Sequence, residues 1–391
     1  MTEPVLMLVN TVAADPVHDA GGRRRVDHRL VAGALHAEVL DLAVVRNSPA
    51  GRLVQRLAGN YVALAVAAFV VLRRRSFSAV LCDNENEALV LAALLKLSGR
   101  RVPLVTLAIN PVPRKKAVFF LVLRVQTHVS MWLSHNTLGL ERLLDRGRVP
   151  ADRLALLPFY ADEQFFDAAA TPSRPSGNRR RPTVLAVGRQ HRDFLLLVEI
   201  ASRLGADVLV AVGSLYSKSP DLLAGRPLPD NVRVVTLTYE QLRQAYADAA
   251  VVVLPTSEED FNPGLTALLE AMSMSCPVVV SRAEGSGDYV ADRRAVLRAA
   301  GLARTTRGLV GQHLGVSDQA VGPHGLYVPV ADGEALLAAI TYLLEHPDEA
   351  RETGRRGRAL IEEGLTLDHF VARLTGHVTS SVAAAPRPPA G

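Results

Sequence analysis

The chain has very little lysine. Four of its 44 basic residues are lysines, so the net charge of +5 comes almost wholly from arginine. No Gly-x-x-x-x-Gly-Lys phosphate loop is present, and Gly285 and Gly287 are not followed by the third glycine that a dinucleotide fingerprint needs at Val290. Kinase-like and dehydrogenase-like functions therefore lose support. No nucleic-acid motif accompanies the positive charge, so no nucleic-acid partner is expected.

Cysteine is scarce as well. Cys82 and Cys276 stand at the end and the start of expected strands, so a disulfide framework is unsupported and a reducing, cytoplasmic setting is expected. The N-terminal MTEPVLMLVN lacks the basic region and cleavage signal of a secretory leader and is typical of a first strand. The eleven histidines are scattered without metal-ligand spacing. We therefore expect no metal and no cofactor.

Apolar runs alternate with helical stretches in two successive series, the pattern of doubly wound parallel sheets. Residues 171–182, TPSRPSGNRRRP, separate the series and form the clearest linker. The sequence thus predicts an α/β protein with two Rossmann-like domains, 1–170 and 183–365, facing a central cleft with ligands at the carboxyl ends of the strands. The expected strands are 5–9, 39–45, 78–82, 102–108, 129–134 and 153–158, then 183–187, 207–212, 231–237, 250–254 and 277–281.

Two stretches combine apolar and basic residues. Residues 57–75 hold an apolar run of about sixteen positions, short of the roughly twenty that span a bilayer. Residues 114–123 pair basic and apolar side chains in the manner of a membrane-surface helix. Core helices are the favoured interpretation of both, and contact with the inner face of a membrane is the alternative.

The most informative segment is AVVVLPTSEEDFNPGLTALLEAMSMSCPVVVS, residues 250–281. It predicts a buried strand, a turn, a helix capped by Asn262 with Pro263 at its first position, and a second buried strand. The free N–H groups at the start of such a helix, Pro263 to Leu265, favour a phosphate. Glu270 comes eight residues after Asn262, which is about 12 Å along a helix. It could accept hydrogen bonds from the sugar hydroxyls of a nucleoside diphosphate, or simply face solvent.

This segment resembles the nucleotide-sugar site of glycosyltransferase family 4, retaining enzymes of GT-B fold. In that family two glutamates stand eight positions apart before a stretch resembling Glu-Ala-Met-Ala-x-Gly-x-Pro-Val-Val. Here the stretch is Glu270-Ala-Met-Ser-Met-Ser-Cys-Pro-Val-Val, with Asn262 in place of the first glutamate and Ser275 in place of the glycine. The resemblance implies that Glu270 binds ribose. It also implies that Asn262 lies near the transferred sugar.

The same resemblance extends to other residues. Val184–Gly188 ends at the cleft, and Arg189 corresponds to the family's diphosphate-binding arginine. The family's lysine a few positions later is absent, and Arg192 is our substitute. Gly21 and Gly22 match the N-terminal glycine pair that lets backbone approach the phosphates. The arginines that follow this pair, residues 23–25, could bind phosphate, although a solvated run is the commoner explanation. The predicted donor site comprises Gly21, Gly22, Gly188, Pro263, Gly264, Leu265 and Glu270, with Arg189, Arg192 and Asn262 as catalytic residues.

The sequence therefore predicts a retaining, metal-independent glycosyltransferase that uses a nucleoside-diphosphate sugar. Lipid, natural-product and glycan acceptors all stay open. In the family the last helix often returns to the first domain, as 366–378 could, with 379–391 as a disordered tail. Residues 293–324 are an insertion relative to the family, which usually passes quickly to the next strand at this point. We expect them to form either a surface excursion or a lid or acceptor contact. The rival functions are a GT-B scaffold protein that has lost turnover and a nucleotide-sugar epimerase of related fold.

Overall fold

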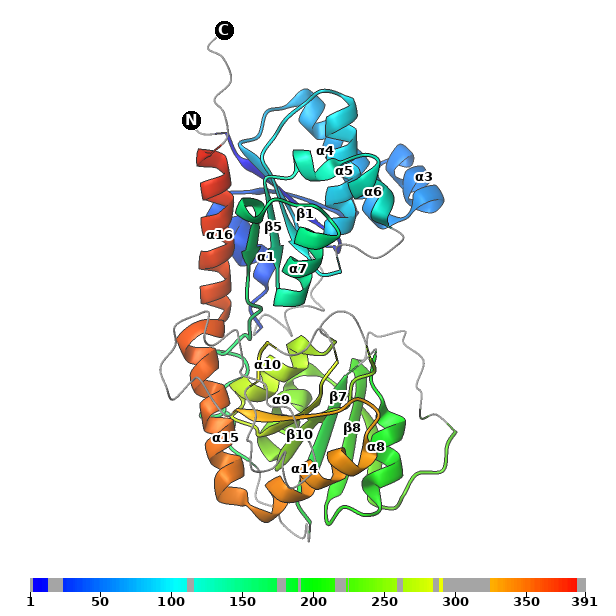
Figure 1. The fold of residues 1–391 in the computed structure, drawn as a ribbon, viewed down its shortest axis with the longest axis vertical. Helices are drawn as coiled ribbons and strands as arrows, with labels where there is room; N and C mark the ends of the chain where they lie inside the picture. Colours follow the sequence, from blue (N-terminus) through cyan, green and yellow to red (C-terminus); the bar gives the residue numbers. More distant parts are fainter. Residues whose placement is uncertain are drawn as a thin grey trace. The chain divides into compact units, whose positions relative to one another are not determined.

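The chain divides into two compact units, each built on its own sheet (Figure 1). The computed structural model describes residues 3–12, 24–110, 116–173, 181–188, 191–214, 223, 225–258, 263–283, 288–290 and 324–384. Unit 1 comprises Met1–His18, Arg25–Pro158 and Phe370–Gly391. Unit 2 comprises Asp19–Arg24 and Phe159–His369.

Each unit contains a six-stranded sheet in which every neighbouring pair of strands is parallel. This confirms the predicted α/β class with two doubly wound sheets. In unit 1 the strands are β1 (Val5–Val9), β2 (Glu38–Asp41), β3 (Ala79–Cys82), β4 (Leu104–Ala108), β5 (Met131–Ser134) and β6 (Leu154–Leu156). In unit 2 they are β7 (Thr183–Gly188), β8 (Asp207–Ser214), β9 (Val232–Leu237), β10 (Val251–Leu254), β11 (Val278–Ser281) and β12 (Gly325–Val328).

The strand orders locate the point where each sheet reverses direction. Unit 1 has the order β2-β1-β3-β4-β5-β6, and unit 2 has β12-β11-β10-β7-β8-β9. The order reverses between β1 and β3 in the first sheet and between β7 and β10 in the second. Connections leave such a pair toward opposite faces of the sheet, and the crevice this creates at the carboxyl ends is where doubly wound folds bind ligands.

Helices supply the outer layers of both units. Those of unit 1 are α1 (Asp27–Leu35), α2 (Leu42–Asn47), α3 (Pro49–Ala58), α4 (Asn60–Arg74), α5 (Glu85–Leu97), α6 (Ala117–Leu121) and α7 (Thr137–Asp145), with short turns η3 (Val125–His128) and η4 (Ala151–Arg153). Those of unit 2 are α8 (Phe194–Ala201), α9 (Tyr239–Asp248), α10 (Leu265–Ser273), α14 (Gly333–Glu345) and α15 (Pro347–Leu360), followed by the π-helical turn η6 (Ile361–Leu365). The last helix, α16 (Leu367–Ala383), begins in unit 2 and continues in unit 1.

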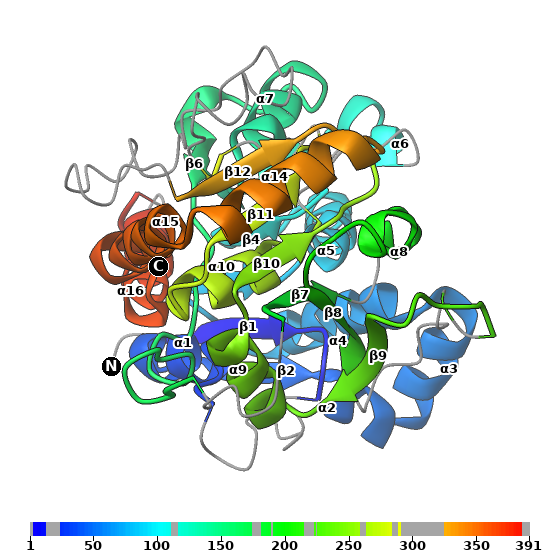
Figure 2. The same cartoon turned by 90° about the horizontal axis from the view of Figure 1, so that it is seen from below.

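Strand β7 shows how the sheet of unit 2 divides its core. Val184 and Ala186 pack in one apolar cluster with α8 and α14, and Leu185 and Val187 pack in the other with α9 and α10. Figure 2 shows α14 across β10, β11 and β12. Successive side chains point to opposite faces, so a strand covered on both faces must be apolar throughout. The near-continuous apolar runs of the sequence follow from this arrangement.

One predicted strand is shorter than expected. Residues 39–45 were expected to be a single strand, but β2 ends at Asp41 and helix α2 begins at Leu42. The Asp41 carboxylate accepts hydrogen bonds from the N–H groups of Ala43 and Val44, at 3.0 and 3.2 Å. An aspartate in this role starts a helix and ends the strand before it.

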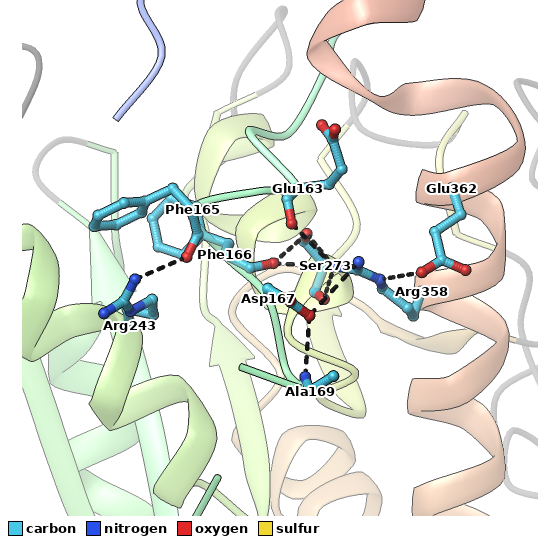
Figure 3. A network of polar contacts seen from close by, with 9 residues as sticks. All are labelled: Glu163, Phe165, Phe166, Asp167, Ala169, Arg243, Ser273, Arg358 and Glu362. Atoms are coloured by element: carbon cyan, nitrogen blue, oxygen red, sulfur yellow. Dashed lines mark hydrogen bonds and ion pairs between the residues drawn. The ribbon is translucent and has the colours of Figure 1, made fainter. Parts of the chain in front are cut away.

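Arg358 of α15 fastens the segment after Phe159 to helix α10 (Figure 3). Its Nη1 donates to the carbonyl oxygens of Phe166 and Ser273, at 3.0 and 2.8 Å, and its Nε donates to Glu362, at 2.7 Å. The Ser273 hydroxyl also donates to the Phe166 carbonyl, at 2.7 Å. These bonds satisfy backbone groups that the irregular segment cannot pair by itself.

The same contacts explain where the units divide. The division falls between Pro158 and Phe159, ahead of the linker predicted at 171–182, because Phe165 and Phe166 lie in the core of unit 2. Residues 174–180 of that linker lie outside the described part of the chain, as do 291–323 and 385–391. Helix α16 continues to Ala383, past residue 379, where the tail was expected to begin.

The apolar stretch at 57–75 mostly forms a core helix. Helix α4 buries Ala63, Leu64, Ala65, Ala68 and Leu72 in the core of unit 1, as the favoured interpretation expected. Within the described ranges, no helix combines the length and apolar character needed to cross a bilayer.

Two carboxyl groups meet at the reversal point of the unit 1 sheet. Asp83 follows β3 and accepts a hydrogen bond from the N–H of Asn10, which follows β1, at 3.0 Å. Glu87, in the first turn of α5, is fully buried beside Asp83. Burial and the neighbouring Asp83 raise the pKa of Glu87. Two ionised carboxylates cannot hydrogen-bond to each other, so the pair is satisfied only while it holds a proton.

This proton makes unit 1 sensitive to alkaline pH. Because the pKa of Glu87 is raised in the folded state, its contribution to stability is present at low pH and is lost as pH rises from the unfolded value through the folded one. The loss is at most about 1.4 kcal/mol per pH unit for one proton. The single tryptophan, Trp132, lies in the same core, so its fluorescence in urea follows unit 1.

We expect the urea midpoint to fall between pH 6 and 9 in the wild-type protein and to fall less in Glu87→Gln, whose amide can donate to Asp83. Glu141→Gln, on an exposed position of α7, is the control and should behave as the wild-type protein. Equal pH dependence in wild type and Glu87→Gln would show that Glu87 is ionised in the folded state.

Candidate functional site

The candidate site lies where the unit 2 sheet reverses, between the carboxyl ends of β7 and β10. The loops after these strands are hydrogen-bonded to each other. Asp193 donates its N–H to the Pro255 carbonyl at 2.7 Å, and Ser257 donates to the His191 carbonyl at 3.1 Å. Arg192 lies between these bonds and pairs with Thr256 as a single antiparallel bridge. The fold therefore holds Arg192 at the edge of the sheet where a ligand is expected.

Arg192 is buried, with 7% of its surface exposed. Its Nε donates to the Val187 carbonyl at 3.1 Å, which fixes the plane of the guanidinium. Burial lowers the pKa of Arg192 to about 10, and the nearby Tyr246 acts in the opposite direction. The group still carries a full positive charge at neutral pH. A buried cation of this kind is suited to an anionic ligand such as a diphosphate.

Two glycines leave room for this guanidinium. Gly188 ends β7 at φ 155°, and Gly264 precedes α10 at φ 85°. A Cβ atom on either residue would overlap the Arg192 side chain. Because L residues with a side chain are also strained at these φ values, both positions favour glycine for two independent reasons. The structure thus brings three predicted site residues, Gly188, Arg192 and Gly264, into contact.

Helix α10 begins later than the sequence predicts. Its first residue is Leu265, and Gly264, in the left-handed conformation, stands before it without a side-chain cap. Pro263 therefore lies in the preceding turn and not at the first helical position, which is a correction. The free N–H groups of the first turn of α10 still lie at the reversal point of the sheet, because Gly264 contacts Arg192 there. Together with the arginine they make this corner positive.

Glu270 is buried one and a half turns into α10, with 6% of its surface exposed. The solvent-exposed alternative is therefore wrong. Its Oε2 accepts a hydrogen bond from the Tyr246 hydroxyl at 3.1 Å. Burial raises the pKa of Glu270 to about 7, and Arg24 and Tyr246 both act to lower it. The carboxyl group therefore changes its charge near neutral pH.

Sequence reasoning missed two residues of this site. Tyr246 is fully buried on α9, and nothing in the sequence distinguishes it from an ordinary core tyrosine. Arg24, expected either to bind phosphate or to belong to a solvated run, belongs to unit 2 and lies over the Tyr239 ring, 4.5 Å from its centroid. Its only signal was its position after the glycine pair.

Several predicted site residues cannot be placed. Arg189, Asn262, Gly21 and Gly22 lie outside the described residues, as does nearly all of the 293–324 excursion. In the part of the chain that is described, no group of three or more His, Cys, Asp or Glu side chains could hold a metal ion.

The contact between Gly264 and Arg192 gives a test of this geometry. Gly264→Ala should destabilise the protein by about 1–3 kcal/mol, the usual cost of a side chain in a left-handed conformation, and should displace Arg192. Gly205→Ala is the matched control, because a Cβ there meets no atom within 4 Å. Urea unfolding of both variants checks the expectation. Equal stability of the two would mean that Gly264 is not constrained.

Comparison with known proteins identifies the fold. Residues 181–346 match the family model described as Glycosyl transferases group 1, and no curated protein sequence matches the chain. A glycosyltransferase from Rickettsia africae is 12% identical with a TM-score of 0.65, over 98% of this chain and 100% of that one. Sucrose-phosphate synthase from Thermosynechococcus elongatus is 17% identical with a TM-score of 0.65, over 98% and 100%. The HepE protein of Anabaena in complex with UDP is 13% identical with a TM-score of 0.64, over 96% and 100%.

The family match, residues 181–346, covers most of the unit that holds Arg192, Gly264 and Glu270, while the structural likeness extends over nearly the whole chain. Two doubly wound parallel sheets in one chain are the arrangement those structures share. The protein has the GT-B fold of glycosyltransferases.

Proposed function

We propose that this protein is a glycosyltransferase of the family 4 kind, which moves a sugar from a nucleoside-diphosphate donor to an acceptor hydroxyl with retention of configuration. The observation that carries the proposal is the site at the reversal of the unit 2 sheet. A buried guanidinium, a helix N-terminus and a buried carboxylate follow one another there, inside the region that matches the glycosyltransferase model. The guanidinium and the helix N-terminus fit the phosphates of a diphosphate, and the carboxylate fits the hydroxyls of a ribose.

Charge development explains the role of each group. As the bond between sugar and diphosphate breaks, negative charge grows on the leaving phosphate. Arg192, with Arg189 and the first turn of α10 from Leu265, would stabilise that charge. These fixed positive groups can act without a metal ion, and we propose metal-independent transfer. The departing phosphate itself would take the acceptor's proton, so the mechanism needs no strong base on the protein.

The remaining predicted residues complete the donor site. Glu270 would accept hydrogen bonds from ribose hydroxyls, and Asn262 would bind the transferred sugar. Gly21 and Gly22 would let backbone approach the phosphates. The HepE structures of Anabaena contain UDP and UDP-glucose, which makes a uridine nucleotide the first donor to test. The acceptor, whether lipid, natural product or glycan, would be bound by unit 1.

Membrane contact is a weaker part of the proposal. Helix α6 exposes Val118 and Leu121, and Val122 follows it, all within the stretch 114–123. Of the basic residues in this stretch, Lys116 pairs with the buried Glu85 at 2.5 Å, whereas Arg114 and Lys115 lie outside the described residues. Contact through these apolar side chains without the Lys116 charge would attract an anionic surface less than the full basic stretch would.

The two rival functions differ from this proposal in the product that each would form from a nucleotide sugar. A scaffold protein would bind a nucleotide without transferring or hydrolysing a labelled sugar. An epimerase would form a new sugar epimer without any acceptor. A radiolabelled UDP-sugar, followed with and without added acceptor hydroxyls, separates the three.

The first experiment is calorimetric titration with UDP, GDP, ADP and dTDP without added metal. We expect one base to be preferred, and we expect Glu270→Ala to weaken that binding by about 1.5–3 kcal/mol, the usual worth of a hydrogen bond to a charged group. This is roughly one to two powers of ten in affinity.

Glu199→Ala, which removes an exposed glutamate of α8, is the control and should leave affinity unchanged. Unchanged affinity in a folded Glu270→Ala variant would overturn the ribose assignment. No binding of any nucleotide by the wild-type protein would overturn the transferase proposal.

A further inference from the structure

We propose that Arg24 and Tyr246 are positioning residues for the Glu270 carboxylate: Tyr246 fixes one carboxylate oxygen, and Arg24 supplies positive charge that favours the ionised form of the buried group. The proposal rests on the proposed function, because it concerns the residue expected to bind ribose. It adds a consequence that the function alone does not contain, namely that nucleotide affinity depends on pH through Glu270.

Tyr246 acts on Glu270 by direct contact. Its hydroxyl donates to Glu270 Oε2 at 3.1 Å, and its own ring is held from behind by Phe166, with centroids 5.9 Å apart in an edge-on arrangement. Phe166 is in turn fastened by Ser273 and Arg358 (Figure 3). The hydroxyl therefore cannot move away from the carboxylate without disturbing a packed layer.

Arg24 acts on Glu270 through its charge. Its guanidinium lies over the Tyr239 ring, and Glu270 raises the pKa of Arg24 against the lowering effect of burial. Within the described residues its Nε is buried without a hydrogen-bond partner. A buried carboxylate is stable only beside a compensating charge, and Arg24 is the cation that acts on this one.

Helix α9 contacts Arg24 through Tyr239 and carries Tyr246 itself. Tyr239, at its first position, carries Arg24 on its ring, and Tyr246 reaches Glu270. The two tyrosines are seven residues apart, about two turns, so they lie on the same side of the helix. One helix face thus organises the surroundings of Glu270 on α10.

The other titratable groups nearby do not replace these two. Arg192, at the ends of β7 and β10, acts to lower the pKa of Tyr246, whereas Arg24 is the cation that acts to lower the pKa of Glu270. Cys276, ahead of β11, is buried, and burial raises its pKa to about 12, so it stays neutral. The ionisation of Glu270 therefore depends on Arg24 and Tyr246 against the effect of burial.

The charge state of Glu270 decides what it can bind. As a carboxylate it accepts hydrogen bonds from two ribose hydroxyls, whereas as a neutral acid one oxygen becomes a donor. Because the pKa of Glu270 is about 7, nucleotide affinity should rise as pH increases through 7 and then level off. Removing Arg24 or the Tyr246 hydroxyl raises this pKa and moves the rise to higher pH.

The test is UDP affinity, or that of whichever nucleotide the wild-type protein prefers, measured by calorimetry from pH 5.5 to 9. Arg24→Gln and Tyr246→Phe should each move the rise upward by about one pH unit, which weakens binding at pH 7 roughly five- to sixfold. Arg24→Lys keeps the charge and should restore the wild-type profile. In Glu270→Gln the nucleotide affinity should not rise through pH 7. Any pH dependence that this variant retains comes from titration of the nucleotide phosphate.

Two matched controls separate this effect from general loss of packing. Tyr342→Phe removes a tyrosine hydroxyl that donates to another carboxylate of unit 2, Glu349, at 2.6 Å. Arg226→Gln removes an exposed arginine of the same unit. Both should keep the wild-type pH profile. A uniform loss of affinity in Arg24→Gln and Tyr246→Phe, with the rise still near pH 7, would overturn the proposal.

A second measurement does not need the nucleotide. The infrared difference spectrum between the wild-type protein and Glu270→Gln shows how the carboxyl band of Glu270 changes with pH. The same comparison, made with Glu270→Gln added to Arg24→Gln and to Tyr246→Phe, gives the titration of Glu270 in each of these variants. An upward shift in both backgrounds supports the inference. Unshifted titration overturns it, even if nucleotide binding stands. If the wild-type protein binds no nucleotide, the proposed function fails while this titration still decides the roles of Arg24 and Tyr246.

Discussion

The arrangement of unit 2 depends on the burial of the Arg192 guanidinium between the ends of β7 and β10. To bury that cation, the chain must bring two loops together through the bonds of Asp193 and Ser257. Positions 188 and 264 must also be glycine, because a Cβ atom at either would overlap the guanidinium. Gly264, in the left-handed conformation, then determines that α10 begins at Leu265. The position of Glu270 follows from that start. A buried charge thus determines the spacing of the whole site.

Each unit holds buried ionisable groups at the reversal point of its sheet. In unit 1 this point holds Asp83 and Glu87, which are satisfied by a shared proton, and in unit 2 it holds Arg192, near Tyr246 and Glu270. The physical cause is the same in each. Connections that leave two neighbouring strands toward opposite faces of the sheet open a crevice at the carboxyl ends, so polar side chains can gather there among apolar layers. Such shifted groups are characteristic of functional sites.

The sequence predicted the sheets well because most strands are apolar along nearly their whole length, and every expected strand occurs. It failed at elements that depend on one side chain or one backbone angle. Asp41 turns the end of a predicted strand into helix α2, and the left-handed Gly264 delays α10 beyond Pro263. Neither residue is unusual in the sequence, since aspartate and glycine are common in loops of every kind. Their effect is visible only where the backbone shows which N–H groups they satisfy or which space they leave.

The sequence by itself determined the fold class, the two series of parallel strands and the placement of Arg192, Gly264 and Glu270 in one region. These follow from local pattern, because hydrophobic periodicity and strand-to-helix turns are encoded in neighbouring residues. Only the tertiary structure decided that Glu270 is buried, that Tyr246 donates to it, and that Arg24, far away in the sequence, supplies its compensating charge. The ionisation of a carboxyl group depends on the charges and the solvent around it in space, and those surroundings exist only once distant segments have packed together.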